Sequence, residues 1–194
     1  MGFVQTTKEI WWDIRGHSFF YWQGLYSMIP SLIGSLFRYR FYRKSFKSLG
    51  EGTHFHEGVY IRNPQKLSVG RHCHIGYQVR IQAGGGVTLA DNVIVAPGVS
   101  IWSSNHIFAD HEIPIKDQGH EFKEVVIGED CWIGSNAFIM PGTEMGRGCI
   151  ISAGAVVGGK KYKDYSILAG NPARVIGFRN LRKEAADAAA KKGT

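Results

Sequence analysis

The sequence predicts an all-β fold, a solenoid in which short parallel strands stack along one axis. The main observation is a strict six-residue period. Six successive blocks from Val69 read VGRHCH, IGYQVR, IQAGGG, VTLADN, VIVAPG and VSIWSS, and six from Ile127 read IGEDCW, IGSNAF, IMPGTE, MGRGCI, ISAGAV and VGGKKY. Every block opens on an aliphatic residue or methionine. A period of six fits no helix, but it suits a short strand followed by a tight turn. Three blocks would then form one triangular coil, with aliphatic columns inside.

The repeat also sets the predicted boundaries. Leu49, Phe55, Ile61 and Leu67 keep the same spacing, and a two-residue slip joins them to Val69. We therefore predict a β-helix domain over residues 49–178, after an N-terminal segment at 1–48. The remaining tail, 179–194, is rich in Ala and Lys and is expected to be a frayed helix or disordered.

The three cysteines follow the same pattern. Cys73, Cys131 and Cys149 all occupy the fifth position of their blocks, as do Ala137 and Ala155. We expect small buried side chains there, rather than a catalytic thiol or a metal site. An odd number of cysteines without a CxxC pair disfavours a disulfide framework and favours a reducing compartment.

Charge and composition limit the classes of partner that the protein is expected to bind. The formal net charge is +7, which favours anionic partners such as a phosphorylated ligand or a membrane surface. No zinc-finger spacing, RNP box or basic zipper is present, so nucleic acid is not expected. Glu9 and Asp13 occupy the place of a basic signal-peptide region, so we expect a cytoplasmic protein.

The N-terminal segment has a different composition. Its apolar residues, among them Trp22, Leu25, Ile29 and Leu36, recur at helical spacing. A basic cluster follows, made up of Arg38, Arg40, Arg43, Lys44 and Lys47. We expect helices here, packed on the β-helix or on a partner subunit. The alternative is peripheral contact of residues 19–47 with the inner face of an anionic membrane, and a spanning helix is disfavoured.

The period stops once, at residues 105–126, between the two runs of blocks. A solenoid tolerates such an extruded loop because the stack stays intact, and long loops on rigid scaffolds often carry function. His106 stands where this loop leaves the coil. The scaffold is therefore expected to fix its position.

The segments ADNVIVAPGVSIWSSNH, VVIGEDCWIGSNAFIMPGTEMGRGCIISAGAVV and LAGNPARVIG resemble the hexapeptide-repeat acyltransferase family. The sequence is most similar there to sugar O-acetyltransferases of the galactoside and maltose type. The resemblance covers about residues 49–178. It implies a left-handed β-helix, a homotrimer with active sites between neighbouring subunits, acetyl-CoA as donor and a sugar or surface-glycan acceptor, without a metal.

The resemblance also implies that His106 is the catalytic base. An alcohol attacks a thioester only after losing its proton, and imidazole suits that task near neutral pH. Asn105 is a candidate for positioning the substrate. An imidazole needs a partner that fixes its tautomer, and the loop offers Asp110, Glu112 and Glu121. Glu121 is slightly favoured because it lies near the return to the coil.

The donor is expected along the second run of blocks. By resemblance, Trp132 lines the acceptor or pantetheine region, and Ser135 and Ala153 contact the pantetheine arm. Arg174 matches an arginine near the adenine nucleotide. The family's Thr-Lys pair is replaced here by the sequence GGKK, so Lys160 and Lys161 both remain candidates for the CoA phosphates. Members of this family supply an acidic acceptor residue from an N-terminal helix, and Asp13 is the one weak candidate.

Three other functions remain as alternatives to sugar O-acetyl transfer. A γ-type carbonic anhydrase shares the β-helix and needs three histidines. His106 and His111 have a suitable spacing, but His72 and His74 lie 34 and 32 residues before His106, not near a multiple of 18. N-acyl transfer to an amino sugar and a non-enzymatic scaffold are the other two.

Overall fold

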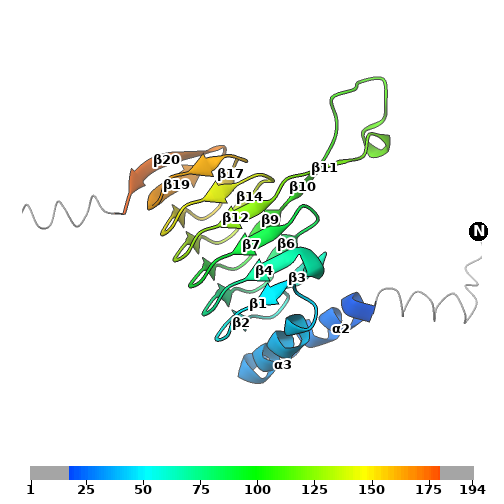
Figure 1. Ribbon diagram of the computed structural model, residues 1–194, viewed down its shortest axis with the longest axis vertical. Coiled ribbons are helices and arrows are strands. Elements are labelled where there is room, and N and C mark those ends of the chain that lie inside the picture. Colours follow the sequence, from blue (N-terminus) through cyan, green and yellow to red (C-terminus); the bar gives the residue numbers. More distant parts are fainter. Residues whose placement is uncertain (1–17, 180–194) are drawn as a thin grey trace, which may run out of the picture.

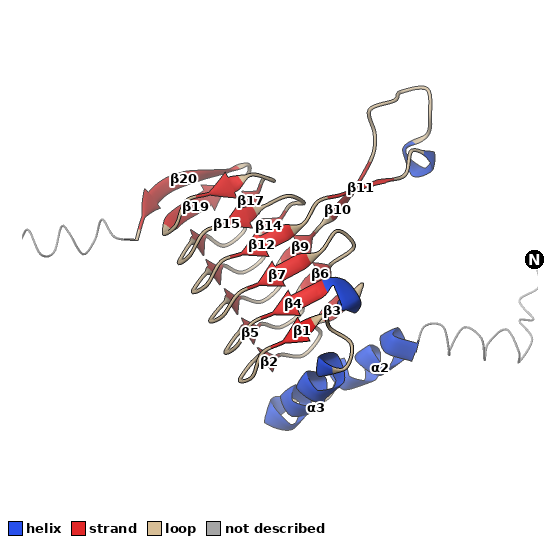
Figure 2. Cartoon of the chain, in the orientation of Figure 1, coloured by secondary structure: helices blue, strands red, loops and turns tan. Residues whose placement is uncertain are grey.

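The computed structural model describes residues 18–179, and within them the chain forms the predicted parallel solenoid (Figure 1). The predicted tail, Glu9 and Asp13 lie outside the described residues, apart from residue 179. Two helices precede the coils, α2 (Ser18–Ser27) and α3 (Ser31–Arg43). Each coil then contributes one strand to each of three sheets, which Figure 2 shows as stacked arrows along one axis.

We call the three faces sheets A, B and C. Sheet A contains β1 (Ser48–Leu49), β4 (Leu67–Val69), β7 (Val87–Leu89), β12 (Val125–Ile127), β15 (Glu144–Met145) and β18 (Lys161–Tyr162). Sheet B contains β2 (His54–Phe55), β5 (His74–Ile75), β8 (Ile94–Val95), β13 (Trp132–Ile133), β16 (Ile150–Ile151), β19 (Ser166–Gly170) and the antiparallel β20 (Ala173–Phe178). Sheet C contains β3 (Tyr60–Arg62), β6 (Arg80–Gln82), β9 (Ser100–Trp102), β14 (Phe138–Ile139) and β17 (Val156–Val157).

Coil length changes along the axis. In sheet B, His54 pairs with His74 and His74 with Ile94, so the first coils contain 20 residues. Trp132 pairs with Ile150, so the coil after the loop contains the expected 18, whereas Ile150 pairs with Ile167 and the last coil contains 17. The extra residues lie at the corner between sheets C and A. One such corner holds the short 3-10 helix η1 (Pro64–Lys66), and the next holds three consecutive glycines at 84–86.

The two extra residues in the early coils shift the predicted six-residue frame in the second half of the first run of blocks. All twelve block-opening residues are buried, as predicted. The register, however, aligns Val69 with Leu89 and Cys73 with the position before Ile94. Val87 therefore aligns with Leu67, at the fifth position of a six-residue block, and not at the first position, where the six-residue frame placed it. The sequence frame missed this slip because Val87 and Leu89 are both aliphatic.

The coils approach each other closely, which explains the glycine after several of the buried aliphatic residues in sheets A and B. A Cβ added to Gly134 would lie 2.6 Å from the backbone nitrogen of Ala153 in the next coil, and one on Gly76 would lie 2.8 Å from that of Pro97. No side chain fits at such positions without moving the backbone.

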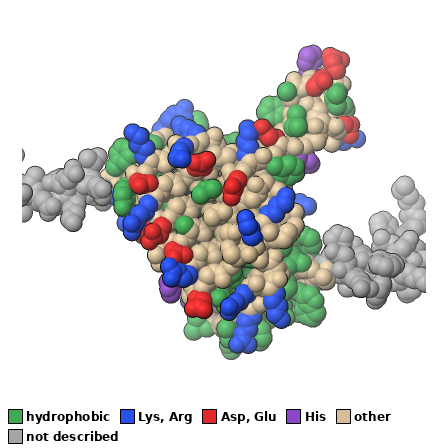
Figure 3. Space-filling model, in the orientation of Figure 1, with side chains coloured by type: hydrophobic (Ala, Val, Ile, Leu, Met, Phe, Trp, Pro, Cys, Tyr) green, Lys and Arg blue, Asp and Glu red, His purple; other side chains and the backbone are tan. Residues whose placement is uncertain are grey.

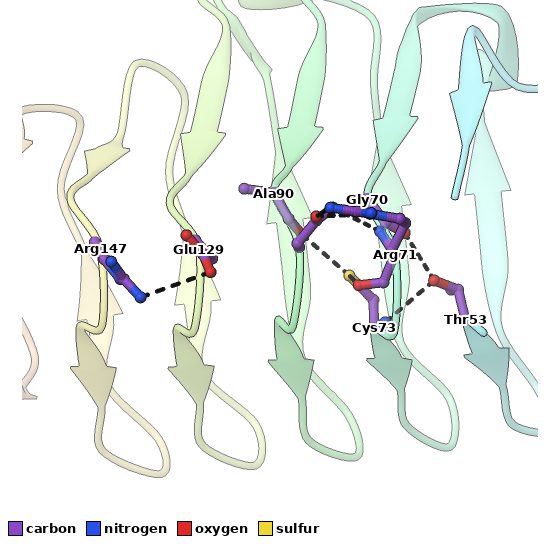
Figure 4. Close-up of polar contacts among 8 residues, drawn as sticks. Thr53, Gly70, Arg71, Cys73, Ala90, Glu129 and Arg147 are labelled. Carbon is purple, nitrogen blue, oxygen red and sulfur yellow. Dashed lines mark hydrogen bonds and ion pairs between the residues drawn. The ribbon is translucent and has the colours of Figure 1, made fainter. Parts of the chain in front are cut away.

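The corner between sheets A and B is held by polar contacts (Figure 4). The Thr53 hydroxyl donates to the Gly70 carbonyl (2.7 Å) and accepts from the Cys73 amide (3.1 Å). The Cys73 thiol lies 3.1 Å from the Ala90 carbonyl, and burial raises the pKa of this thiol. All three cysteines are free and buried, as predicted.

The two helices close the N-terminal end of the solenoid. Gln23 is buried and pairs with the backbone of Ile61, accepting from its amide at 2.8 Å. The buried guanidinium of Arg38 donates to the carbonyls of Phe55 (2.9 Å), Tyr26 (2.9 Å) and Ile29 (2.7 Å). Arg38, predicted as part of a basic cluster, is therefore an interior link between helix and coil, and desolvation lowers its pKa.

The outward faces of the helices remain apolar. The large exposed apolar side chains here are Tyr21, Trp22, Leu25, Met28, Leu32, Ile33, Leu36 and Phe37. Figure 3 shows green and blue side chains gathered at this lower end of the molecule. Among residues 18–179, no helix has the length and apolar character needed to cross a membrane.

Candidate active site

The predicted loop leaves the solenoid at the corner between sheets C and A, and its base is a two-stranded ribbon. Strands β10 (Ser104–His106) and β11 (His120–Phe122) pair antiparallel, and η2 (Ile115–Asp117) lies on the returning limb of the loop, shortly before β11 (Figure 1). The coil resumes at β12. The extruded loop is therefore confirmed, with an ordered base instead of an irregular excursion.

The ribbon has two distinct faces. Side chains alternate across a strand, so Ser104 and His106 share one face and Asn105 takes the other. The Ser104 hydroxyl accepts from Gln82 Nε2 at 2.9 Å, and Gln82 belongs to the previous coil. Its cross-strand partner Phe122 packs beside Gly84, also in the previous coil. This face therefore looks toward the N-terminal coils.

His106 lies on that N-terminal face, and its neighbour is a second imidazole. His106 pairs directly with His120 across the ribbon, and the two ring centroids are 4.3 Å apart. Both side chains are exposed. The amide of His106 donates to Asn105 Oδ1 at 3.0 Å, which fixes the backbone at the base of the loop.

Glu121, the favoured orienting carboxylate, lies on the opposite face of the ribbon. It pairs with Asn105, and its carboxylate forms an ion pair with Lys123 at 2.8 Å. The other candidates, Asp110 and Glu112, lie in the loop near its tip, where Glu112 contacts His111 at 3.3 Å. Within this chain the structure brings no loop carboxylate to His106.

The predicted donor residues lie elsewhere on the solenoid. Ser135 and Ala153 occupy successive turns between sheets B and C, and the Gly154 amide donates to the Ser135 carbonyl at 2.8 Å. These two residues are therefore stacked, as contacts to one extended ligand require. Trp132 projects from sheet B, half exposed, between Ile94 and Ile150.

Trp132 and His106 do not meet within one chain. The ribbon leaves where sheet C joins sheet A, and in a triangular coil that corner lies opposite sheet B. The imidazole and the indole are thus on opposite sides of the solenoid. A site that uses both needs a second copy of the chain.

The basic residues gather around a tyrosine that the sequence did not single out. Lys160 Nζ lies 5.4 Å from the centroid of the Tyr162 ring, and the Tyr162 hydroxyl donates to the Gly158 carbonyl at 3.1 Å. Burial raises the pKa of this phenol, and the nearby guanidinium of Arg174 offsets part of that rise. Lys161 instead forms an ion pair with Glu144 at 3.1 Å. The structure thus distinguishes the two lysines: Lys160 lies over the Tyr162 ring, which Arg174 also influences, and Lys161 forms an ion pair with Glu144 on sheet A.

The histidines proposed for a zinc enzyme are dispersed. His74 pairs with His54 and Ile94 in sheet B, whereas His106 lies on the ribbon and His111 near its tip. Among residues 18–179, no group of three His, Cys, Asp or Glu side chains is arranged to hold a metal ion.

Two residues near the site were missed by sequence analysis. His120 was overlooked because the loop has no repeat from which its pairing register follows. Tyr162 was overlooked because it closes a block of the second run, and nothing in the block pattern marks that position as functional.

Comparisons with known proteins agree with this architecture. The family description "Bacterial transferase hexapeptide (six repeats)" matches residues 124–159, and "Hexapeptide repeat of succinyl-transferase" matches residues 66–103. A probable acetyltransferase from Mycobacterium tuberculosis is 34% identical over 161 residues, covering 72% of this chain and 52% of that protein. Galactoside O-acetyltransferase from Escherichia coli is 31% identical over 134 residues, covering 69% and 64%.

A solved structure is also similar. A galactoside acetyltransferase in complex with coenzyme A superposes with a TM-score of 0.76 at 26% identity, covering 93% of this chain and 87% of that one. The chain belongs to the hexapeptide-repeat acyltransferase family, whose fold is the left-handed β-helix. It spans between about half and two thirds of the length of the two curated relatives described above.

The separation of the two lysines makes a prediction about coenzyme A. Lys160→Ala should weaken CoA binding about tenfold, because a charge-assisted contact to phosphate contributes roughly 1.5 kcal/mol. Lys161→Ala, the matched control, should change it less than about threefold, since its ammonium already has a partner. Isothermal titration with CoA measures both. A larger loss for Lys161→Ala would contradict the assignment.

Proposed function

We propose that the protein transfers an acetyl group from acetyl-CoA to a hydroxyl of a sugar or glycan, with His106 as general base. The observation that carries the proposal is the placement of His106 at the ordered base of the one loop that leaves the described solenoid. The similarity to a CoA-bound galactoside acetyltransferase supports the donor and the acceptor class.

The reaction is a direct transfer. The imidazole of His106 accepts the hydroxyl proton, and the oxygen forms a bond to the thioester carbonyl carbon. The carbon–sulfur bond then breaks, and the imidazolium returns its proton to the leaving CoA thiolate. The His120 ring contacts the His106 ring, with centroids 4.3 Å apart, and is proposed to limit its rotation. Within this chain, no contact between Glu121 and His106 supports the orienting role predicted for Glu121.

The donor is proposed to lie over the stacked turns of Ser135 and Ala153. Lys160 and Arg174 are then placed for its phosphates, close to the Tyr162 ring. Asn105 is proposed to assist substrate positioning through its location beside the base. N-acyl transfer to an amino sugar would use the same groups and is retained as the second candidate.

The role of His106 is tested with two histidine variants from the same loop. His106→Ala should lower the turnover number by about 10²–10⁴-fold, the range typical of losing a general base. His111→Ala, near the loop tip with a side chain 90% exposed, should keep wild-type turnover. Release of free CoA thiol from acetyl-CoA and a sugar panel reports the rate. Wild-type turnover in His106→Ala would refute the assignment.

We further propose a homotrimer in which His106 of one subunit works with Trp132 of its neighbour. The proposal rests on the opposite locations of the two side chains on a single solenoid. Closed three-fold assembly brings the loop corner of each subunit to a face of the next.

Mixed oligomers test this sharing. His106→Ala and Trp132→Ala are each expected to be inactive alone. When the two variants are refolded together in equal amounts, roughly a quarter of wild-type turnover should return. In a randomly assembled ring with heterologous interfaces, roughly one interface in four joins a subunit with intact His106 to a neighbour with intact Trp132. No recovery would show that both residues act within one subunit.

We also propose that the helical end contacts an anionic membrane surface, with the protein on its cytoplasmic side. The exposed apolar side chains of α2 and α3 lie beside exposed Arg40, Arg43, Lys44 and Lys47, and this combination suits binding at an interface.

Vesicle sedimentation checks the membrane proposal. Binding should be strong with phosphatidylglycerol in the vesicles and weak with phosphatidylcholine alone. Leu32→Glu, at a side chain 79% exposed, should reduce binding at least several-fold. Ile176→Glu, 66% exposed on β20, is the control and should bind as wild type. Equal binding by both variants would rule out this surface.

A further inference from the structure

The outer face of sheet C carries a small cleft next to the ribbon that holds His106. Its volume is about 200 Å³, and it spans the first three strands of the sheet. The lining residues are Tyr60, Arg62, Arg80, Ile81, Gln82 and Trp102. None of the functional residues predicted from sequence lies in this cleft.

The charge of the cleft is unbalanced. Arg62 and Arg80 come from neighbouring strands and are diagonal neighbours, because Arg80 pairs with Tyr60 and Arg62 with Gln82. Such diagonal neighbours lie about 7–8 Å apart. No acidic side chain lines the cleft, and within residues 18–179 neither guanidinium forms an ion pair. Two guanidinium groups on the same face of the sheet raise the local positive potential, so a bound anion would be favoured there.

Aromatic side chains form the other walls. Trp102 is 39% exposed and is braced by Phe138, with ring centroids 5.4 Å apart. Tyr60 is 45% exposed and stacks on Phe20 of α2 at 6.2 Å. Such rings offer a flat apolar face together with a polar edge, which suits a ring-shaped ligand that also carries hydroxyl groups.

The cleft is linked directly to the base. Gln82, in its lining, donates to the Ser104 hydroxyl at 2.9 Å. Ser104 and His106 project from the same face of β10, two residues apart, which corresponds to about 7 Å along a strand. His106 therefore lies two residues along the ribbon from the hydroxyl that Gln82 contacts.

We propose that the acceptor is an anionic sugar, one that carries a carboxylate or a phosphate ester, bound in this cleft. Arg62 and Arg80 hold the anionic group, Trp102 and Tyr60 pack on the ring, and a hydroxyl is directed to His106. The inference rests on the proposed acetyl transfer and specifies its substrate class.

Matched acceptors test the proposal. CoA thiol release is measured with 4-nitrophenyl β-glucuronide, 4-nitrophenyl β-glucoside and glucose 6-phosphate. The wild-type protein should prefer an anionic acceptor, and the preferred one identifies the anion. Arg62→Gln and Arg80→Gln should each lower kcat/KM for that acceptor at least about tenfold, as expected for losing a charge-assisted contact, and leave the glucoside within about twofold. Arg147→Gln, which removes the same charge at the distant corner between sheets A and B, should change neither.

A binding measurement separates this inference from the proposed function. The glucuronide and the sugar phosphate are titrated into each variant without acetyl-CoA, with thermal unfolding as the check that the variants fold. Arginine-dependent binding without thiol release from any acceptor would support the anionic site and refute acetyl transfer. Thiol release that is equal for all acceptors and insensitive to Arg62→Gln and Arg80→Gln would overturn the anionic acceptor and leave acetyl transfer intact.

Discussion

The structure depends on the close stacking of successive coils. Every backbone amide in the ladder must meet a carbonyl of the next coil, and the buried aliphatic columns leave no room for a shift in register. Gly134, with the next backbone 2.6 Å from where its Cβ would be, shows how little separation remains. Extra residues can therefore enter only at corners. They do so at η1, at the glycines 84–86 and, on the largest scale, at the ribbon that carries His106.

The same constraint determines which side chains of the loop face each end of the solenoid. Because both ends of the ribbon join fixed strands, its register is fixed, and its two faces look toward opposite ends of the solenoid. His106 and His120 face the coils that hold the arginine cleft, whereas Glu121 and Lys123 face the C-terminal coils. The opposite location of Trp132 is what makes a shared site between subunits the natural arrangement under the proposed function.

The coil could be predicted because one aliphatic residue in six is enough to define a buried column. The predicted exit of the loop at residue 105 follows from the same six-residue period. The prediction was less specific where that signal was ambiguous or absent. Val87 was placed in the wrong column since Leu89 is equally aliphatic. Glu121 was favoured on nearness in sequence, but strand alternation puts it on the other face from His106. The arginine cleft joins residues 60–102 across three coils, and no single repeat contains it.

The central claim is that His106 of one subunit acts on a donor bound along the coils of a neighbouring subunit. The most direct measurement is a crystal structure of the full protein with coenzyme A, in which the distance from the CoA sulfur to the nearest His106 imidazole is read. The account predicts a sulfur within about 5 Å of that ring, near the separation needed for attack, with Ser135 and Ala153 along the pantetheine arm. Coenzyme A bound elsewhere, with its sulfur facing no His106 of any subunit, would contradict it.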